Sequence, residues 1–121
     1  MIWVAVAIAG AAGAVCRFLV DHAVTARRRG RFPWGTLVVN LSGAVVIGVV
    51  AGAVAHAGVH PDVRLVAGAG FCGAYTTFST LIYETWRLIE DRAYASAVAN
   101  LGSLVLSAPA AAAGWAAAAA W

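Results

Sequence analysis

A cluster of hydroxyl side chains lies inside the apolar segment 65–83, which contains no charged residue. Two glycines precede the cluster, and five of the six residues from Tyr75 to Thr80 carry a hydroxyl. Lipid hydrocarbon offers no hydrogen-bond partner to such side chains or to an unwound backbone. The segment is therefore stable in a membrane only where it is buried in protein or lines a hydrated path. The segment predicts that the protein accommodates a polar species inside the membrane.

The composition indicates a membrane protein. Of the 121 residues, 63% are hydrophobic and 11% are charged, which is far from the balance of a soluble domain. Four apolar segments each approach or exceed the roughly 20 residues that span a hydrocarbon core as a helix. We therefore expect an all-α membrane protein with one four-helix transmembrane domain over residues 1–121, its spans at about 2–20, 32–57, 65–86 and 93–119. Four short helices do not enclose a pore easily, so an oligomer is expected.

Arg17 is the one charged residue inside the first apolar segment. Gly10 and Gly13 precede it, and small residues on one helix face allow a second helix to approach closely. The Arg17 guanidinium either extends to the membrane interface or supplies a positive field at a vestibule. The sequence leaves both interpretations open.

Asn40 lies inside the second apolar segment. Its amide can bond a neighbouring helix, or it can present N–H donors to an anion in a pore. On this residue alone the packing role is favoured. Further along, Gly48 and Gly52 form a small-xxx-small pattern that is typical of close helix packing.

We expect the third helix to break in the middle of the membrane, between about Gly73 and Thr77. Glycines permit unusual dihedral angles, and nearby hydroxyls can bond the freed backbone groups. Such a break turns carbonyl oxygens inward, which is a common way to hold a desolvated cation. Beyond it, Glu84, Arg87 and Asp91 stand at i, i+3 and i, i+4 spacing, which predicts a solvated helix end.

Polar residues follow one face of the fourth segment at steps of four, three and four: Ser96, Asn100, Ser103 and Ser107. This stripe either forms hydrogen bonds between helices or lines one wall of a hydrated path. No segment has an acidic residue at its centre. Proton-coupled exchange needs a titratable group within the membrane, so the sequence argues against it.

Three motifs occur in the order of one known family. They are Gly10-x-x-Gly13-Ala14-x-x-Arg17-Phe18, Phe32-Pro33-x-Gly35-Thr36-Leu37-x-x-Asn40-x-x-Gly43 and Gly70-x-x-Gly73-x-x-Thr76-Thr77-Phe78-Ser79-Thr80. With these motifs the chain resembles the Fluc/CrcB fluoride channels over all four segments. The resemblance implies a channel, not an enzyme, that passes fluoride passively across the bacterial cell membrane and lowers its cytoplasmic level.

The resemblance also implies an antiparallel, dual-topology-type dimer with two narrow pores. A sodium ion at its centre would be structural and would not be transported. Carried over by position, the backbone carbonyls of Gly73 and Thr76 would bind this sodium.

The implied pore replaces the water around fluoride with hydrogen-bond donors. Asn40 would donate its amide N–H, and Phe78 would present the positive edge of its ring. Arg17 would sit at a vestibule. Hydroxyls along the path would come from Thr80, Ser103 and Ser107.

Two residues depart from the family pattern. Leu81 stands where phenylalanine is common and Ala99 where tyrosine often occurs, and both positions belong to the family's pore lining.

A small four-helix multidrug exporter is an alternative function for a chain of similar length. It requires a membrane-embedded acid in its first span, and segment 2–20 has none. A non-conducting assembly subunit is a second alternative, which the packing glycines alone would permit.

The arginines are distributed unequally between the two ends of the predicted bundle. The first and third connections carry six of them, while the termini and the second connection carry Arg64 alone. Basic residues in short loops favour the cytoplasm, so we expect extracytoplasmic termini. Such a bias favours one fixed orientation beside a homologous, oppositely inserted subunit, and a homodimer that tolerates the bias is the alternative. The six are Arg27, Arg28, Arg29, Arg31, Arg87 and Arg92.

Overall fold

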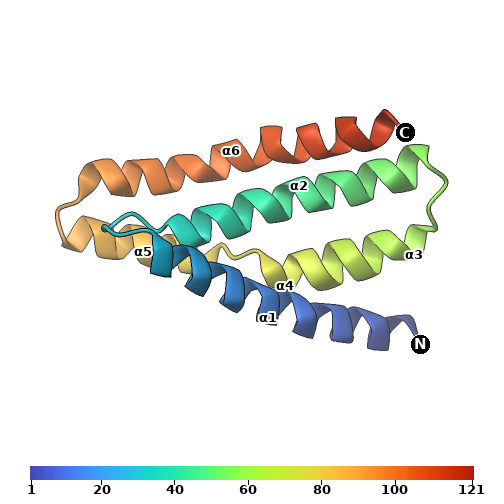
Figure 1. Ribbon diagram of the computed structural model, residues 1–121, viewed down its shortest axis with the longest axis horizontal. Helices are drawn as coiled ribbons and strands as arrows, with labels where there is room; N and C mark the ends of the chain where they lie inside the picture. The colour runs from blue at the N-terminus through green and yellow to red at the C-terminus, as the bar shows by residue number, and fades with distance from the viewer.

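The computed structural model describes all 121 residues, and regular structure in it is entirely helical. Three passes are single long helices: α1 (Ile2–Arg27), α2 (Trp34–His56) and α6 (Tyr94–Ala119). The third pass is divided into α3 (Pro61–Val63), the π-helix η1 (Arg64–Cys72), α4 (Gly73–Tyr75) and α5 (Ser79–Glu90). Each pass is long and apolar enough to cross a membrane, so the predicted four-span helical fold is confirmed. Both termini lie at the same end of the bundle (Figure 1).

The first helix continues beyond the apolar segment 2–20 as far as Arg27. Nothing between Val20 and Arg27 disfavours a helix, because the first glycine after Gly13 is Gly30. Hydropathy marks where polar residues begin, whereas a helix ends where its backbone is interrupted. Asp21 is therefore a helical residue, with a fixed direction relative to α2.

The third pass departs from regular helix after Tyr75 and resumes it at Ser79. Thr76 has an extended backbone (φ −80°, ψ 160°), whereas Gly73 is helical (φ −61°, ψ −35°). The expectation of unusual dihedral angles at Gly73 is therefore wrong. Extended backbone is open to any L-residue, so the interruption needs no glycine.

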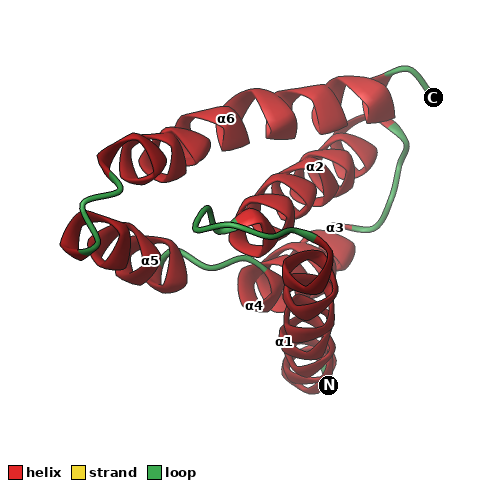
Figure 2. Cartoon of the chain, turned by 60° about the vertical axis from the view of Figure 1, so that its left-hand side comes forward, coloured by secondary structure: helices red, strands yellow, loops and turns green.

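The glycines serve close packing instead. A Cβ on Gly48 would collide with the Ala111 carbonyl of α6, and one on Gly114 would collide with the Val45 carbonyl of α2. A Cβ on Gly13 would likewise meet the Phe71 carbonyl of η1. The small-residue packing predicted for the first two segments is confirmed. It places α2 between α6 on one side and the third pass on the other (Figure 2).

Candidate functional site

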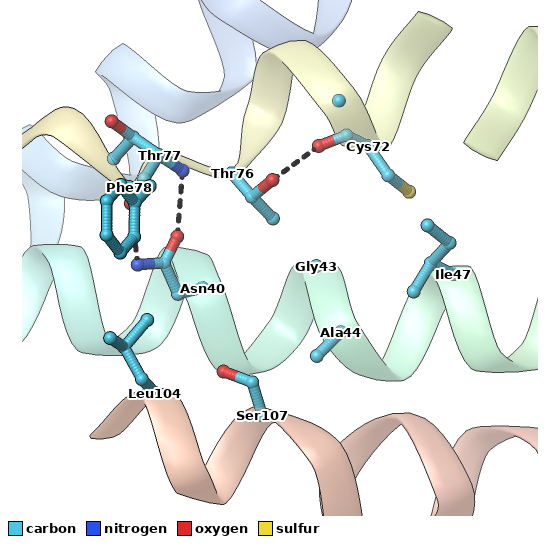
Figure 3. A pocket seen from close by; sticks show the side chains of 11 residues that line it. Asn40, Gly43, Ala44, Ile47, Cys72, Thr76, Thr77, Phe78, Leu104 and Ser107 are labelled. Carbon is cyan, nitrogen blue, oxygen red and sulfur yellow. Dashed lines mark hydrogen bonds between the residues drawn. The ribbon is translucent and has the colours of Figure 1, made fainter. Parts of the chain in front are cut away.

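The side chain of Asn40 holds the interrupted backbone of the third pass. Its Nδ2 donates to the Thr77 carbonyl at 2.9 Å, and the Thr77 N–H donates to its Oδ1 at 2.8 Å. Figure 3 shows this amide facing the chain between Thr76 and Phe78. One amide thus pairs both polar backbone groups of a residue that has no helical partners. Only one of the two Nδ2 hydrogens is needed for these bonds.

Several carbonyl oxygens lose their helical partners at this point, among them those of Gly73 and Thr76. In a continuous α-helix the Thr77 N–H would bond the Gly73 carbonyl, and the Thr80 N–H would bond the Thr76 carbonyl. The Thr77 N–H bonds Asn40 instead, and the Thr80 N–H donates to Thr77 Oγ1 at 3.2 Å. The Gly73 and Thr76 carbonyls are therefore released from the helical ladder.

A cavity of about 290 Å³ opens beside the interruption. Five residues of the predicted site line it: Asn40, Gly73, Thr76, Phe78 and Ser107. Ser107 reaches it from α6, across the cavity from Thr76 (Figure 3). Phe78 is 62% exposed in the single chain, so its ring is free to meet a solute or another subunit. No charged residue lines this cavity.

Thr80 and Arg17 lie in a second, smaller cavity of about 160 Å³. Thr77 lines both cavities and therefore lies between them. Its hydroxyl donates to Thr80 Oγ1 at 3.0 Å. Asp21 also lines the second cavity and, in addition, a third one of about 440 Å³ at the arginine-rich end.

Glu84 lies in that third cavity and is not part of a solvated helix end, so the sequence-based interpretation of this residue is wrong. Its Oε1 accepts a hydrogen bond from Thr36 Oγ1 at 2.9 Å, and its Oε2 is buried without a partner. No arginine lies within 4.0 Å of a carboxylate oxygen, so Glu84 is not paired with Arg87. Helical spacing predicted that pair, but the packing of α5 turns Glu84 toward α2. Thr36 could not be recognised from the sequence as a partner of Glu84, because a lone hydroxyl has no spacing signal.

The polar stripe of α6 divides between packing and cavity. Asn100 is fully buried and donates from Nδ2 to the Leu81 carbonyl (3.1 Å) and to Thr85 Oγ1 (3.0 Å). Ser103 is also buried and donates to the Asn100 carbonyl at 2.6 Å. Asn100 thus joins α6 to α5, whereas the Ser103 hydroxyl bonds a carbonyl of its own helix. The structure does not bring Ser103 to the cavity that Ser107 lines.

The two departures from the family pattern fall in different surroundings. Leu81 is fully buried, so its side chain packs within its own chain and reaches neither cavity. Ala99 is exposed on α6.

The comparison with known families covers nearly the whole chain, including every residue of the three cavities. Residues 4–115 match the family described as "CrcB-like protein, Camphor Resistance (CrcB)". The chain belongs to the CrcB family. With its four long apolar helices it is a multi-pass membrane protein of that family.

Three relatives illustrate the CrcB similarity. Fluoride-specific ion channel FluC 2 of Mycobacterium tuberculosis (strain ATCC 25618 / H37Rv) is 50% identical over 100 residues, covering 83% of this chain and 76% of that protein. FluC 1 of Frankia casuarinae is 46% identical over 114 residues, with 89% and 88% covered. FluC 1 of Symbiobacterium thermophilum is 43% identical over 102 residues, with 83% and 82% covered.

Replacing Asn40 by alanine should loosen the backbone at the interruption. Two backbone groups of Thr77 would lose their partners, at a cost of about 2 kcal/mol, which is roughly a 30-fold faster amide exchange at Thr77. Hydrogen–deuterium exchange of the protein in nanodiscs measures this rate. Asn100→Ala is the matched control, since it removes a buried amide that bonds α5 and not the interruption. Equal acceleration at Thr77 in both variants would contradict the assignment of Asn40.

Proposed function

We propose that the chain is a subunit of a fluoride channel that passes the ion passively across the cell membrane and lowers its cytoplasmic concentration. The observation that carries this proposal is the uncharged cavity at the interruption, lined by Asn40, Phe78 and Ser107. These groups can replace water around a small anion with neutral donors. The names of the CrcB-family relatives support the same ion.

A route through the subunit follows from the residues that neighbouring cavities share. We call the cavity of about 440 Å³ at the arginine-rich end the outer cavity, that of about 160 Å³ the middle cavity and that of about 290 Å³ at the interruption the inner cavity. Asp21 lines the outer and middle cavities, and Thr77 lines the middle and inner ones. Arg17 in the middle cavity offsets the charge of Asp21, so an anion is not repelled there. The absence of fixed charge in the inner cavity keeps binding weak enough for release, which conduction requires.

The inner cavity offers three kinds of contact to fluoride. Asn40 retains one N–H beyond the one that bonds Thr77. The Ser107 hydroxyl donates to the Ser103 carbonyl at 3.3 Å, and it can turn its hydrogen from that carbonyl toward the cavity when fluoride is present. The ring of Phe78 can present its positive edge. Hydroxyl groups of Thr77 and Thr80 would continue the path into the middle cavity.

The multidrug-exporter alternative fits less well. It needs a carboxylate in the middle of its first span, and the one carboxylate of α1 is Asp21, near the helix end and against Gly35 at the start of α2. A non-conducting assembly subunit does not require a series of connected polar cavities, so this alternative also fits less well.

The fluoride proposal predicts efflux from proteoliposomes that contain the chain alone or together with a second CrcB-family chain. Ser107→Ala should reduce this flux by about tenfold because it removes one donor from the path. Ser103→Ala is the matched control on the same helix, and it should leave the flux within about twofold. A fluoride-selective electrode measures both. No efflux under either condition would disprove the channel.

A structural sodium ion fits the same interruption. Gly73 and Thr76 line the uncharged cavity, and their carbonyls are free of helical hydrogen bonds. Such carbonyls are suitable ligands for a desolvated sodium ion. The ion would neutralise inward-facing carbonyl dipoles where two subunits meet. This site would be structural, with no part in transport.

Sodium should stabilise the assembled protein against heat, since it would bind only the folded state. Thr77→Val removes the Oγ1 that accepts the Thr80 N–H, so this N–H can return to the Thr76 carbonyl. The variant should need about tenfold more sodium for the same stabilisation, by the cost of about one hydrogen bond. Thermal unfolding in sodium chloride, with N-methyl-D-glucamine chloride as the control, measures this dependence. Equal melting temperatures in the two salts for the unchanged chain would contradict the site.

The subunit is proposed to work in an antiparallel dimer beside a homologous chain of opposite orientation. The arginine-rich connections lie at one end of the bundle, opposite the termini (Figure 1). There, Arg31 Nη1 donates to the Asp91 carbonyl at 3.3 Å, which joins the first and third connections. A concentrated positive charge at one end favours a single orientation with extracytoplasmic termini.

A cysteine added after Trp121 should react with a membrane-impermeant maleimide from outside intact cells, in a chain whose Cys16 and Cys72 are replaced by serine. Arg29→Cys in the same background is the control for the opposite face and should react only after lysis. Comparable labelling of both cysteines from outside, with fluoride flux from the chain alone, would support the dual-topology homodimer instead.

A further inference from the structure

A groove of about 500 Å³ lies between the end of α1 and the start of α2, separate from the three cavities above in all but Arg28 and Trp34. The part of the groove nearest the α1–α2 connection is basic and aromatic, and the part further along α2 is aliphatic. The lining residues are Val24, Arg27, Arg28, Trp34, Leu37, Val38, Leu41 and Ser42.

The groove opens on a different side of α2 from the fluoride cavity. At 100° per residue, Leu41 and Val38 of the groove lie about 40° and 100° from Leu37 around the helix axis. Asn40 and Gly43 of the cavity lie about 60° and 120° from Leu37 in the opposite direction. None of the groove's α2 residues from Leu37 onward lines the cavity at the interruption. The groove is therefore distinct from the cavity at the interruption.

The two arginines of the groove have no anionic partner within the chain. No carboxylate lines the groove, and no carboxylate oxygen lies within 4.0 Å of either arginine. Asp21, the nearest acidic residue in sequence, lies against Gly35 and lines the other cavities. Arg27 and Arg28 therefore present positive charge to the groove with no carboxylate beside it, and Arg28 also lines the third cavity together with Asp21, Glu84 and Asp91.

Trp34 fixes the direction of one of these charges. The Arg28 Cζ lies 5.1 Å from the centre of the Trp34 ring. A guanidinium stacked on an aromatic face keeps its in-plane N–H groups free for a bidentate anion. Tryptophan in the first turn of a membrane-spanning helix belongs at the level of the lipid headgroups.

We propose that this groove binds an anionic phospholipid of the leaflet in which the arginine-rich end of the bundle lies. The phosphodiester would bond Arg27 and Arg28, and one acyl chain would lie along Leu37, Val38 and Leu41. A free phosphate would leave this aliphatic part uncovered, whereas a lipid matches both the charge and the apolar lining. Basic pockets between membrane helices are suited to anionic headgroups.

Native mass spectrometry of the purified protein, titrated with phosphatidylglycerol, tests the site. Replacing both Arg27 and Arg28 by glutamine should weaken binding of the first lipid by about 30-fold, or about fivefold for each arginine. Arg29→Gln is the matched control, since Arg29 is a neighbouring exposed arginine outside the groove, and it should change the affinity by less than about twofold.

A second variant tests the groove without changing its charge. Val38→Trp should fill the aliphatic part and weaken phosphatidylglycerol binding by at least about fivefold, because acyl-chain contact is lost. Circular dichroism confirms that each variant remains helical. The proposal is overturned by an equal loss in Arg29→Gln, by unchanged binding in Val38→Trp, or by displacement of the lipid with soluble glycerol 3-phosphate.

Discussion

The paired hydrogen bonds between the Asn40 amide and the Thr77 backbone hold together the part of the structure on which the site depends. Thr77 lies where helical hydrogen bonding lapses, in a segment that lipid could not solvate. An asparagine provides a donor and an acceptor in one plane, so it can replace both missing partners. Asn40 by itself favoured a packing role, and the family resemblance implied a role in the pore. In the structure its amide supports the interruption, and its remaining N–H is left for a solute.

Several features follow from that pairing. Diverting the Thr77 N–H releases the Gly73 carbonyl, and the Thr77 hydroxyl does the same for Thr76 by accepting the Thr80 N–H. The non-helical residues also create the cavity into which Phe78 and Ser107 project. The same short segment can thus offer carbonyl oxygens to a cation and neutral donors to an anion. This combination is why one interruption serves both the proposed sodium site and the proposed fluoride path.

Close backbone contact fixes the frame around this segment. Gly48 and Gly114 bring α2 and α6 together, and Gly13 brings α1 against Phe71. Small residues allow dispersion contacts between helices whose association gains little from burial in an apolar solvent. Large apolar side chains, including Trp3 and Val105, remain exposed. They leave apolar surface for lipid or a second subunit to cover.

The sequence by itself determined the four helical spans, the packing glycines and the position of the hydroxyl cluster, because apolar length and small-residue spacing are local properties of a chain. It could not assign partners across the bundle. Asn40 and Thr77 are 37 residues apart, and only the packing of α2 against the third pass brings them within 3 Å. Helix packing likewise left Ser107 but not Ser103 at the cavity, and it turned Glu84 toward Thr36. Tertiary structure decided these roles because a polar side chain in a membrane bonds whichever group the neighbouring helix presents.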